Sequence, residues 1–76
     1  MKEKINFINP EVLSERLKAA QKEHKMTCEE LAERLDAHPT SVQTWRSGKN
    51  LPSLDMAVGI AEIFGMSIDY LVGRGE

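Results

Sequence analysis

The segment from residue 38 to residue 52, HPTSVQTWRSGKNLP, constrains the fold more than any other part of the chain. Between Pro39 and Gly48 its only large apolar residues are Val42 and Trp45, which lie three positions apart, close to one helical turn. Proline is favoured at the first position of a helix, and glycine is favoured just beyond its end. The segment therefore predicts a short helix that is held by two buried side chains and is otherwise polar.

Four further segments carry the start and stop signals of helices. A residue that can cap a helix stands before each of them; these residues are Asn9, Thr27, Ser53 and Ser67. The five expected helices run from Pro10 to around Glu23–Lys25, from 28 to 35, from Pro39 to Ser47–Gly48, from 54 to 64 and from 68 to 72. His38 precedes the third of them as an unusual cap. No stretch alternates between apolar and polar residues as a strand does. The sequence thus predicts an all-α fold of five helices joined by short loops.

The composition is that of one small globular domain, with 76 residues, 41% hydrophobic and 29% charged. A chain of this size buries only about 60% of its unfolded surface, so every helix must contribute to stability. We expect no membrane span and no signal peptide, because the apolar runs are too short. The lone Cys28 excludes an internal disulfide and is consistent with a cytoplasmic protein.

The expected boundaries are an N-terminal arm at 1–8, a helical domain at 9–73 and a tail at 74–76. The arm is either a frayed terminus, a dimer arm or a staple onto the first helix. The tail is either an end or the start of a linker.

Charge is distributed unevenly along the chain. The formal net charge is −2, but residues 1–25 carry six basic and four acidic residues, whereas residues 26–76 carry four basic and eight acidic ones. Within that acidic part, residues 37–54 hold Arg46 and Lys49 and no acid. A polyanion can still bind such a protein if the acids face away from it.

The second and third predicted helices are both short, and only residues 36–38 separate them. This is the helix-turn-helix arrangement, in which the first helix braces the second. The expected core anchors of the pair are Leu31, Leu35, Val42 and Trp45. The outward face of the second helix then offers only uncharged polar side chains, Thr40, Gln43, Thr44 and Ser47. Such a face can enter a major groove and exchange hydrogen bonds with base edges.

Several sequence motifs lie in one order along the chain: T-x-E-E-L-A from Thr27, S-V-x-x-W-x-x-G-K from Ser41, L-P-S-L from Leu51 and A-x-x-F-G-M-S-I-D-Y-L-V-G from Ala61. In this order and spacing the chain resembles the Cro/CI-like helix-turn-helix family of phage and bacterial repressors (XRE-type transcriptional regulators) over residues 13–74. The resemblance implies a five-helix repressor-like domain that binds operator DNA as a sequence-specific regulator. It also implies a homodimer, with two recognition helices roughly 34 Å apart. In the last predicted helix we expect Ile68, Leu71 and Val72 to face inward, and we expect the dimer to form through this helix and the surface around Ile68, Tyr70 and Leu71.

The resemblance also implies which residues contact double-stranded DNA. The base-reading positions are Pro39, Thr40, Gln43 and Thr44, and the backbone-contacting positions are Cys28, His38, Arg46, Ser47, Lys49 and Asn50. Among the base-reading residues, only Gln43 has an amide for a bidentate contact, most naturally with adenine. Lys49 is equally well interpreted as an ordinary surface lysine. With so few cations the salt dependence of binding is expected to be shallow.

Three features depart from the family pattern. Cys28 stands where glutamine is usual, and a thiol is a weak hydrogen-bond donor to phosphate. Pro39 can offer a base only apolar contact. Gln21 and Arg46 occupy positions where many members pair an arginine with a glutamate, so Arg46 is expected to face solvent or phosphate.

Other classes of function fit the sequence less well. The same fold also serves as an antitoxin or adaptor with weak or no DNA binding, and the acidic balance, Cys28 and Pro39 favour that alternative. An enzyme is not expected, because the sequence has no nucleophile–base pair and no phosphate loop. His24, Cys28 and His38 lack the spacing of a zinc site, and the acids of residues 29–33 fit a capping box and a solvated face. We therefore predict no catalytic residue, metal, other cofactor or small-molecule substrate. A redox role for Cys28 is a minor alternative.

Overall fold

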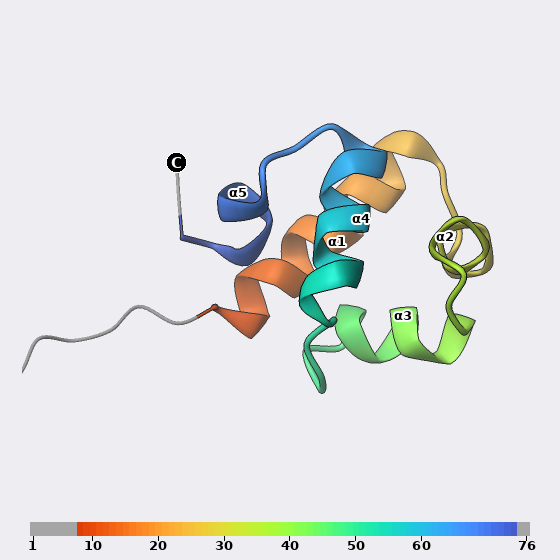
Figure 1. The fold of residues 1–76 in the computed structure, drawn as a ribbon, viewed down its shortest axis with the longest axis horizontal. Coiled ribbons are helices and arrows are strands. Elements are labelled where there is room, and N and C mark those ends of the chain that lie inside the picture. Colours follow the sequence, from red (N-terminus) through yellow and green to blue (C-terminus); the bar gives the residue numbers. More distant parts are fainter. Residues whose placement is uncertain (1–7, 75–76) are drawn as a thin grey trace, which may run out of the picture.

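A computed structural model describes residues 8–74, and these form five helices and no strand. The helices are α1 (Pro10–His24), α2 (Cys28–Leu35), α3 (Pro39–Arg46), α4 (Leu54–Phe64) and α5 (Ile68–Val72). The all-α, five-helix prediction is therefore confirmed. In Figure 1, α1 and α4 lie at the centre, α2 and α3 lie on one side of them, and α5 lies on the other. Most of the predicted arm (1–7) and the end of the predicted tail (75–76) lie outside the described residues.

Most of the helices begin at a residue whose side chain accepts hydrogen bonds from the first backbone N–H groups, which have no carbonyl partner within the helix. The Oδ1 atom of Asn9 accepts hydrogen bonds from the backbone N–H groups of Glu11 and Val12, at 3.1 and 3.3 Å. Thr27 and Glu30 form the reciprocal capping box at the start of α2. His38, by contrast, makes no side-chain capping bond, and Pro39 at the first helical position supplies the start of α3.

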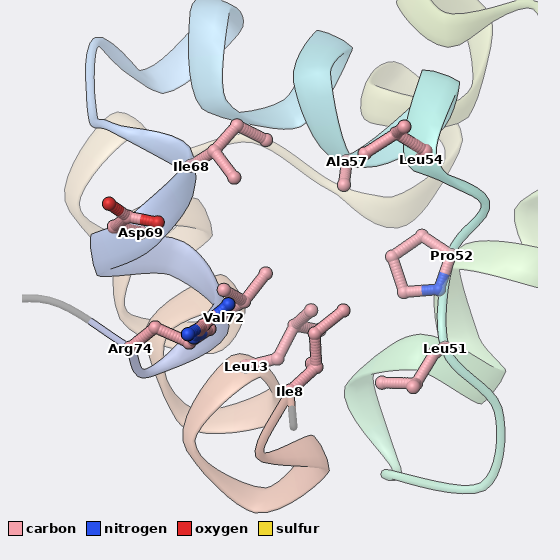
Figure 2. Close-up of a pocket in the computed structure, with 10 residues that line it drawn as sticks. All are labelled: Ile8, Leu13, Leu51, Pro52, Leu54, Ala57, Ile68, Asp69, Val72 and Arg74. Atoms are coloured by element: carbon pink, nitrogen blue, oxygen red, sulfur yellow. The ribbon is translucent and has the colours of Figure 1, made fainter. Parts of the chain in front are cut away.

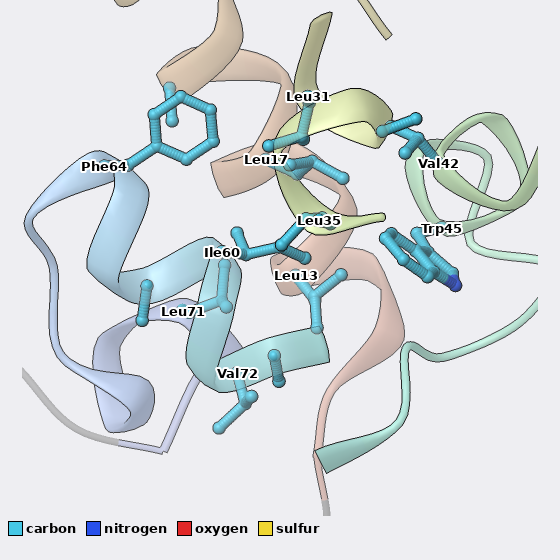
Figure 3. Close-up of a cluster of buried hydrophobic side chains, with 14 residues drawn as sticks. Leu13, Leu17, Leu31, Leu35, Val42, Trp45, Ile60, Phe64, Leu71 and Val72 are labelled. Carbon is cyan, nitrogen blue, oxygen red and sulfur yellow. The ribbon is translucent and has the colours of Figure 1, made fainter. Parts of the chain in front are cut away.

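Each helix sends at least one apolar side chain into a common core (Figure 3). The largest fully buried side chains are Leu13 and Leu17 of α1, Leu31 of α2, Val42 of α3, Ile60 of α4 and Leu71 of α5. Burial of one such side chain stabilises a fold by about 1.5–3 kcal/mol. Leu71 is 0% exposed, so the expectation that it forms part of a dimer surface is wrong. Its place on the inner face of α5 assigns it to the core.

Two close approaches hold the helices in place. A Cβ atom at Gly59 of α4 would lie 2.7 Å from the Cδ2 atom of Leu35, so any larger residue there would require the end of the Leu35 side chain to move. At the other side, the Arg16 guanidinium lies 3.9 Å from the centroid of the Tyr70 ring and donates to the Tyr70 carbonyl. These contacts tie α5 to α1. No helix within residues 8–74 has the length and apolar character needed to cross a membrane.

Candidate nucleic-acid interface

The helix α3 is fixed by its two apolar residues and presents its other face outward. Val42 is 0% exposed and Trp45 is 6% exposed, and both pack against side chains of α1 and α2 (Figure 3). On the opposite face Thr40 and Gln43 are exposed. Neither of these two side chains has a hydrogen-bond partner within the part of the chain that the structure describes. Their hydrogen-bonding groups are thus available to an external partner.

The remaining base-reading candidates are less accessible. Pro39 and Thr44 are half-buried. The Thr44 hydroxyl donates to the Ser41 carbonyl at 2.7 Å, which leaves its oxygen as an acceptor only. Of the four predicted positions, Thr40 and Gln43 therefore stand furthest into solvent.

The loop that follows α3 places the predicted backbone-contacting residues beside the same face. Gly48 adopts a left-handed backbone with φ +79°, which turns the chain away from the helix end. The backbone N–H groups of Lys49 and Asn50 both donate to the Thr44 carbonyl, at 3.1 and 3.4 Å. Those amides are used internally, so only the exposed side chains of Lys49 and Asn50 can meet phosphate.

Two further hydroxyl or ring groups border this face. Ser47 is exposed, and its hydroxyl donates to the Thr44 carbonyl at 2.9 Å. His38 is exposed at the start of α3. His38 and Ser47 thus lie at opposite ends of α3, and a duplex that contacted this helix along its length would meet both of them.

Cys28, at the start of α2, contacts one residue of α1 and one residue of α3. Its Sγ atom lies 3.7 Å from Nε2 of Gln21 and 3.9 Å from Nη1 of Arg46. Arg46, which is predicted to face solvent or phosphate, is half-buried against the thiol and lines an open groove. Its Nε atom is buried and has no hydrogen-bond partner among residues 8–74, and the same holds for Oε1 of the buried Gln21. The thiol accepts weakly from Nε2 of Gln21 and Nη1 of Arg46, and these contacts leave Oε1 and Nε without a partner.

An open basic groove runs beside this cluster. Lys18, Lys22 and Lys25 of α1 line it together with Gln43 and Arg46 of α3. These lysines were not among the residues predicted to contact DNA. Their spacing of four and three residues, which places them on one side of α1, was the available signal.

A second feature, on α1, α4, α5 and the loop after α3, is apolar (Figure 2). Here a cavity of about 220 Å³ is bordered by Ile8, Leu51 and Leu54, and all three are exposed. Ile68 of α5 lines the same cavity and is half-buried. Within residues 8–74 no group of three or more His, Cys, Asp or Glu side chains could hold a metal ion.

A short bracing helix, a tight turn and a second helix with a polar outward face define a helix-turn-helix domain. A family model described as helix-turn-helix matches residues 17–71. The chain belongs to this family, that of the XRE-type, Cro/CI-like transcriptional regulators.

Two relatives and one solved structure illustrate the similarity. The chain is 34% identical over 59 residues to the uncharacterized HTH-type transcriptional regulator YobD of Bacillus subtilis (strain 168), covering 78% of this chain and 53% of that protein. It is 32% identical over 63 residues to the HTH-type transcriptional activator BcrR of Enterococcus faecalis, covering 83% of this chain and 31% of that protein. The P22 c2 repressor in complex with a synthetic operator has the same fold, with a TM-score of 0.79 over 84% of this chain and 97% of that one at 19% identity. This chain therefore spans about half, or less, of the length of the two relatives.

Proposed function

We propose that the protein is a sequence-specific DNA-binding transcriptional regulator that represses by occluding a promoter. The observation that carries this proposal is the outward face of α3, where the Gln43 amide and the Thr40 hydroxyl stand exposed above the buried Val42 and Trp45. An exposed amide on a rigid helix can form the bidentate contact that distinguishes one base pair from another. The P22 c2 repressor, which shares the fold, is itself found on operator DNA.

The proposed contacts divide into two groups. Base edges are read by Thr40 and Gln43, with apolar contact from Pro39 and an acceptor oxygen from Thr44. The backbone is met by the side chains around the ends of α2 and α3, which are Cys28, His38, Arg46, Ser47, Lys49 and Asn50. Backbone contacts set the register and carry no sequence information directly.

We further propose that the regulator acts as a homodimer through its apolar cavity rather than through the outer face of α5 alone. Leu54 is 76% exposed and Leu51 is 43% exposed, although both are apolar. Contiguous exposed apolar groups on a small protein mark an interaction surface. A two-fold dimer would bury these side chains and present two copies of α3 to one duplex.

Selection of bound duplexes from a random pool tests the proposal. Enrichment of a two-fold symmetric site supports a dimeric sequence-specific regulator. Enrichment of an asymmetric site contradicts only the dimer and leaves sequence-specific DNA binding supported. If no sequence is enriched and random duplex does not bind at low salt, the DNA-binding function is wrong. Co-purification of a protein partner under those conditions would then favour the adaptor alternative.

A further inference from the structure

The three groove lysines occupy one side of α1 and are exposed to solvent. Lys18, Lys22 and Lys25 are separated by four and three residues, so they follow one another along the helix. All three belong to the second half of α1 or its C-cap. A cation near a helix C-terminus is stabilised by the helix dipole, but the ammonium groups themselves remain in water.

The groove that they line adjoins the proposed recognition face. Gln43 and Arg46 of α3 form its other wall, and Cys28 lies between the two walls. Lys18 also borders a smaller hollow with Gln43, Arg46 and Ser47. The lysines are thus neighbours of the base-reading amide, although 18 or more residues separate them from it along the chain.

The charge of the groove is opposite to that of the chain as a whole. Four cations line it, Lys18, Lys22, Lys25 and Arg46, against the single carboxylate of Glu29. The complete chain has a formal net charge of −2, so its acids are concentrated elsewhere. The neighbouring Glu30 is directed to Thr27 in the capping box. An open and positively charged surface fits an extended polyanion better than a small ligand, which needs an enclosed pocket.

We infer that Lys18, Lys22 and Lys25 bind the phosphate backbone of the DNA that flanks the bases read by α3. This inference rests on the proposed DNA-binding function and extends it by a second contact strip on α1. It replaces the expectation of a shallow salt dependence. Each phosphate that a cation neutralises changes the slope of log K against log salt concentration by about −0.9.

The test is a salt titration of DNA binding by the full chain and its variants. The variants are Lys18→Gln, Lys22→Gln and Lys25→Gln, singly and combined, and the matched control is Arg34→Gln, which removes an exposed charge of α2 outside the groove. Affinity is measured for a selected site and for random duplex between about 50 and 200 mM salt. Far-UV circular dichroism checks that each variant keeps its helices.

The combined variant should bind both duplexes more weakly, with a slope shallower by about 0.9 for each lysine removed. Lys18→Arg should keep the slope, and Arg34→Gln should leave it within error. An unchanged slope in the combined variant, or an equal loss in the control, would overturn the inference and leave the regulator proposal intact. If the unmodified chain binds neither duplex, it is the proposed function itself that fails.

Discussion

The surface of this protein has two regions whose exposed side chains lie outside the core, and the two regions differ in chemistry. The side formed by α3, its following loop and the groove of α1 is polar, with the exposed amide of Gln43 at its centre. The side formed by the cavity is apolar, with Leu54 76% exposed. A chain this small needs nearly every helix for stability, yet the exposed side chains of these two regions do not contribute to the core.

This difference in chemistry indicates that the two regions bind different partners. Hydrogen-bonding groups without internal partners favour a polar ligand whose edges can be matched, which we propose to be DNA. Apolar side chains without internal partners favour a second protein surface, which we propose to be another copy of the chain. Because the core lies between the two, a substitution in the core should abolish both functions, whereas a substitution in either region should affect one.

Trp45→Ala should have the largest effect, because Trp45 is 6% exposed and packs beneath α3. Loss of a buried tryptophan costs about 3–5 kcal/mol of folding free energy, which is comparable to the total stability of a small domain, about 5 kcal/mol. Urea denaturation should show a variant with little remaining stability, which unfolds at very low urea and loses both regions together. The control is Gln43→Ala on the same helix, which should alter stability by less than about 0.5 kcal/mol. A fully stable Trp45→Ala variant would refute the assignment of Trp45 as an anchor.

Leu54→Asp should separate the two regions. If Leu54 is buried between two copies, its loss removes about 1.5–3 kcal/mol from each half of a two-fold interface. The dimer dissociation constant, measured by sedimentation equilibrium, should therefore rise by about 100-fold or more. Monomer stability should hardly change, because the side chain is already 76% exposed. Leu54→Met keeps the apolar surface and should dimerise normally; equal dimerisation by Leu54→Asp would place the interface elsewhere.

The fold could be predicted from sequence because its signals are local. A cap, a proline or a glycine acts within one helical turn, so Asn9, Thr27 and Gly48 mark helix ends whatever the rest of the chain does. Spacing also identified Val42 and Trp45, since no other large apolar side chain on α3 could face the core.

The site was less predictable because it depends on contacts between distant segments. Spacing places three lysines on one side of α1, but only the packing of α1 on α3 brings that side to Gln43. The environment of Arg46 depends on Cys28 and Gln21, which belong to two other parts of the chain. Leu71 was predicted both to face inward and to lie in the dimer surface, and its burial contradicts only the second prediction, because spacing shows which side of a short helix packs on the core but not where a second copy would bind.

Gln43→Ala tests whether the polar region reads sequence. A bidentate contact to the preferred base discriminates by about 1–3 kcal/mol, so the affinity for the selected site should fall by roughly 5- to 150-fold. The affinity for random duplex should fall much less, because backbone contacts remain. Fluorescence anisotropy with sites altered one base pair at a time should show relaxed specificity at one step. An equal fall for every sequence would instead assign Gln43 to the backbone.

The smallest expected effect, and a gain, is that of Cys28→Gln. The thiol lies between Gln21 and Arg46 at the start of α2 and is a poor donor to phosphate. A glutamine there carries an amide that can reach further, and one added hydrogen bond should tighten DNA binding by about 1 kcal/mol, or roughly fivefold. The amide is neutral and releases no counterion, so the salt slope should stay the same.

Cys28→Met is the matched control, since methionine is similar in length to glutamine and has no N–H donor. It should not tighten binding. A gain by both variants would mean that side-chain bulk at this position matters, whereas a loss by Cys28→Gln would mean that the thiol is needed to hold Arg46 beside the groove. A steeper slope would identify a repositioned cation rather than the amide as the new contact, because only a charged group releases counterions from the duplex.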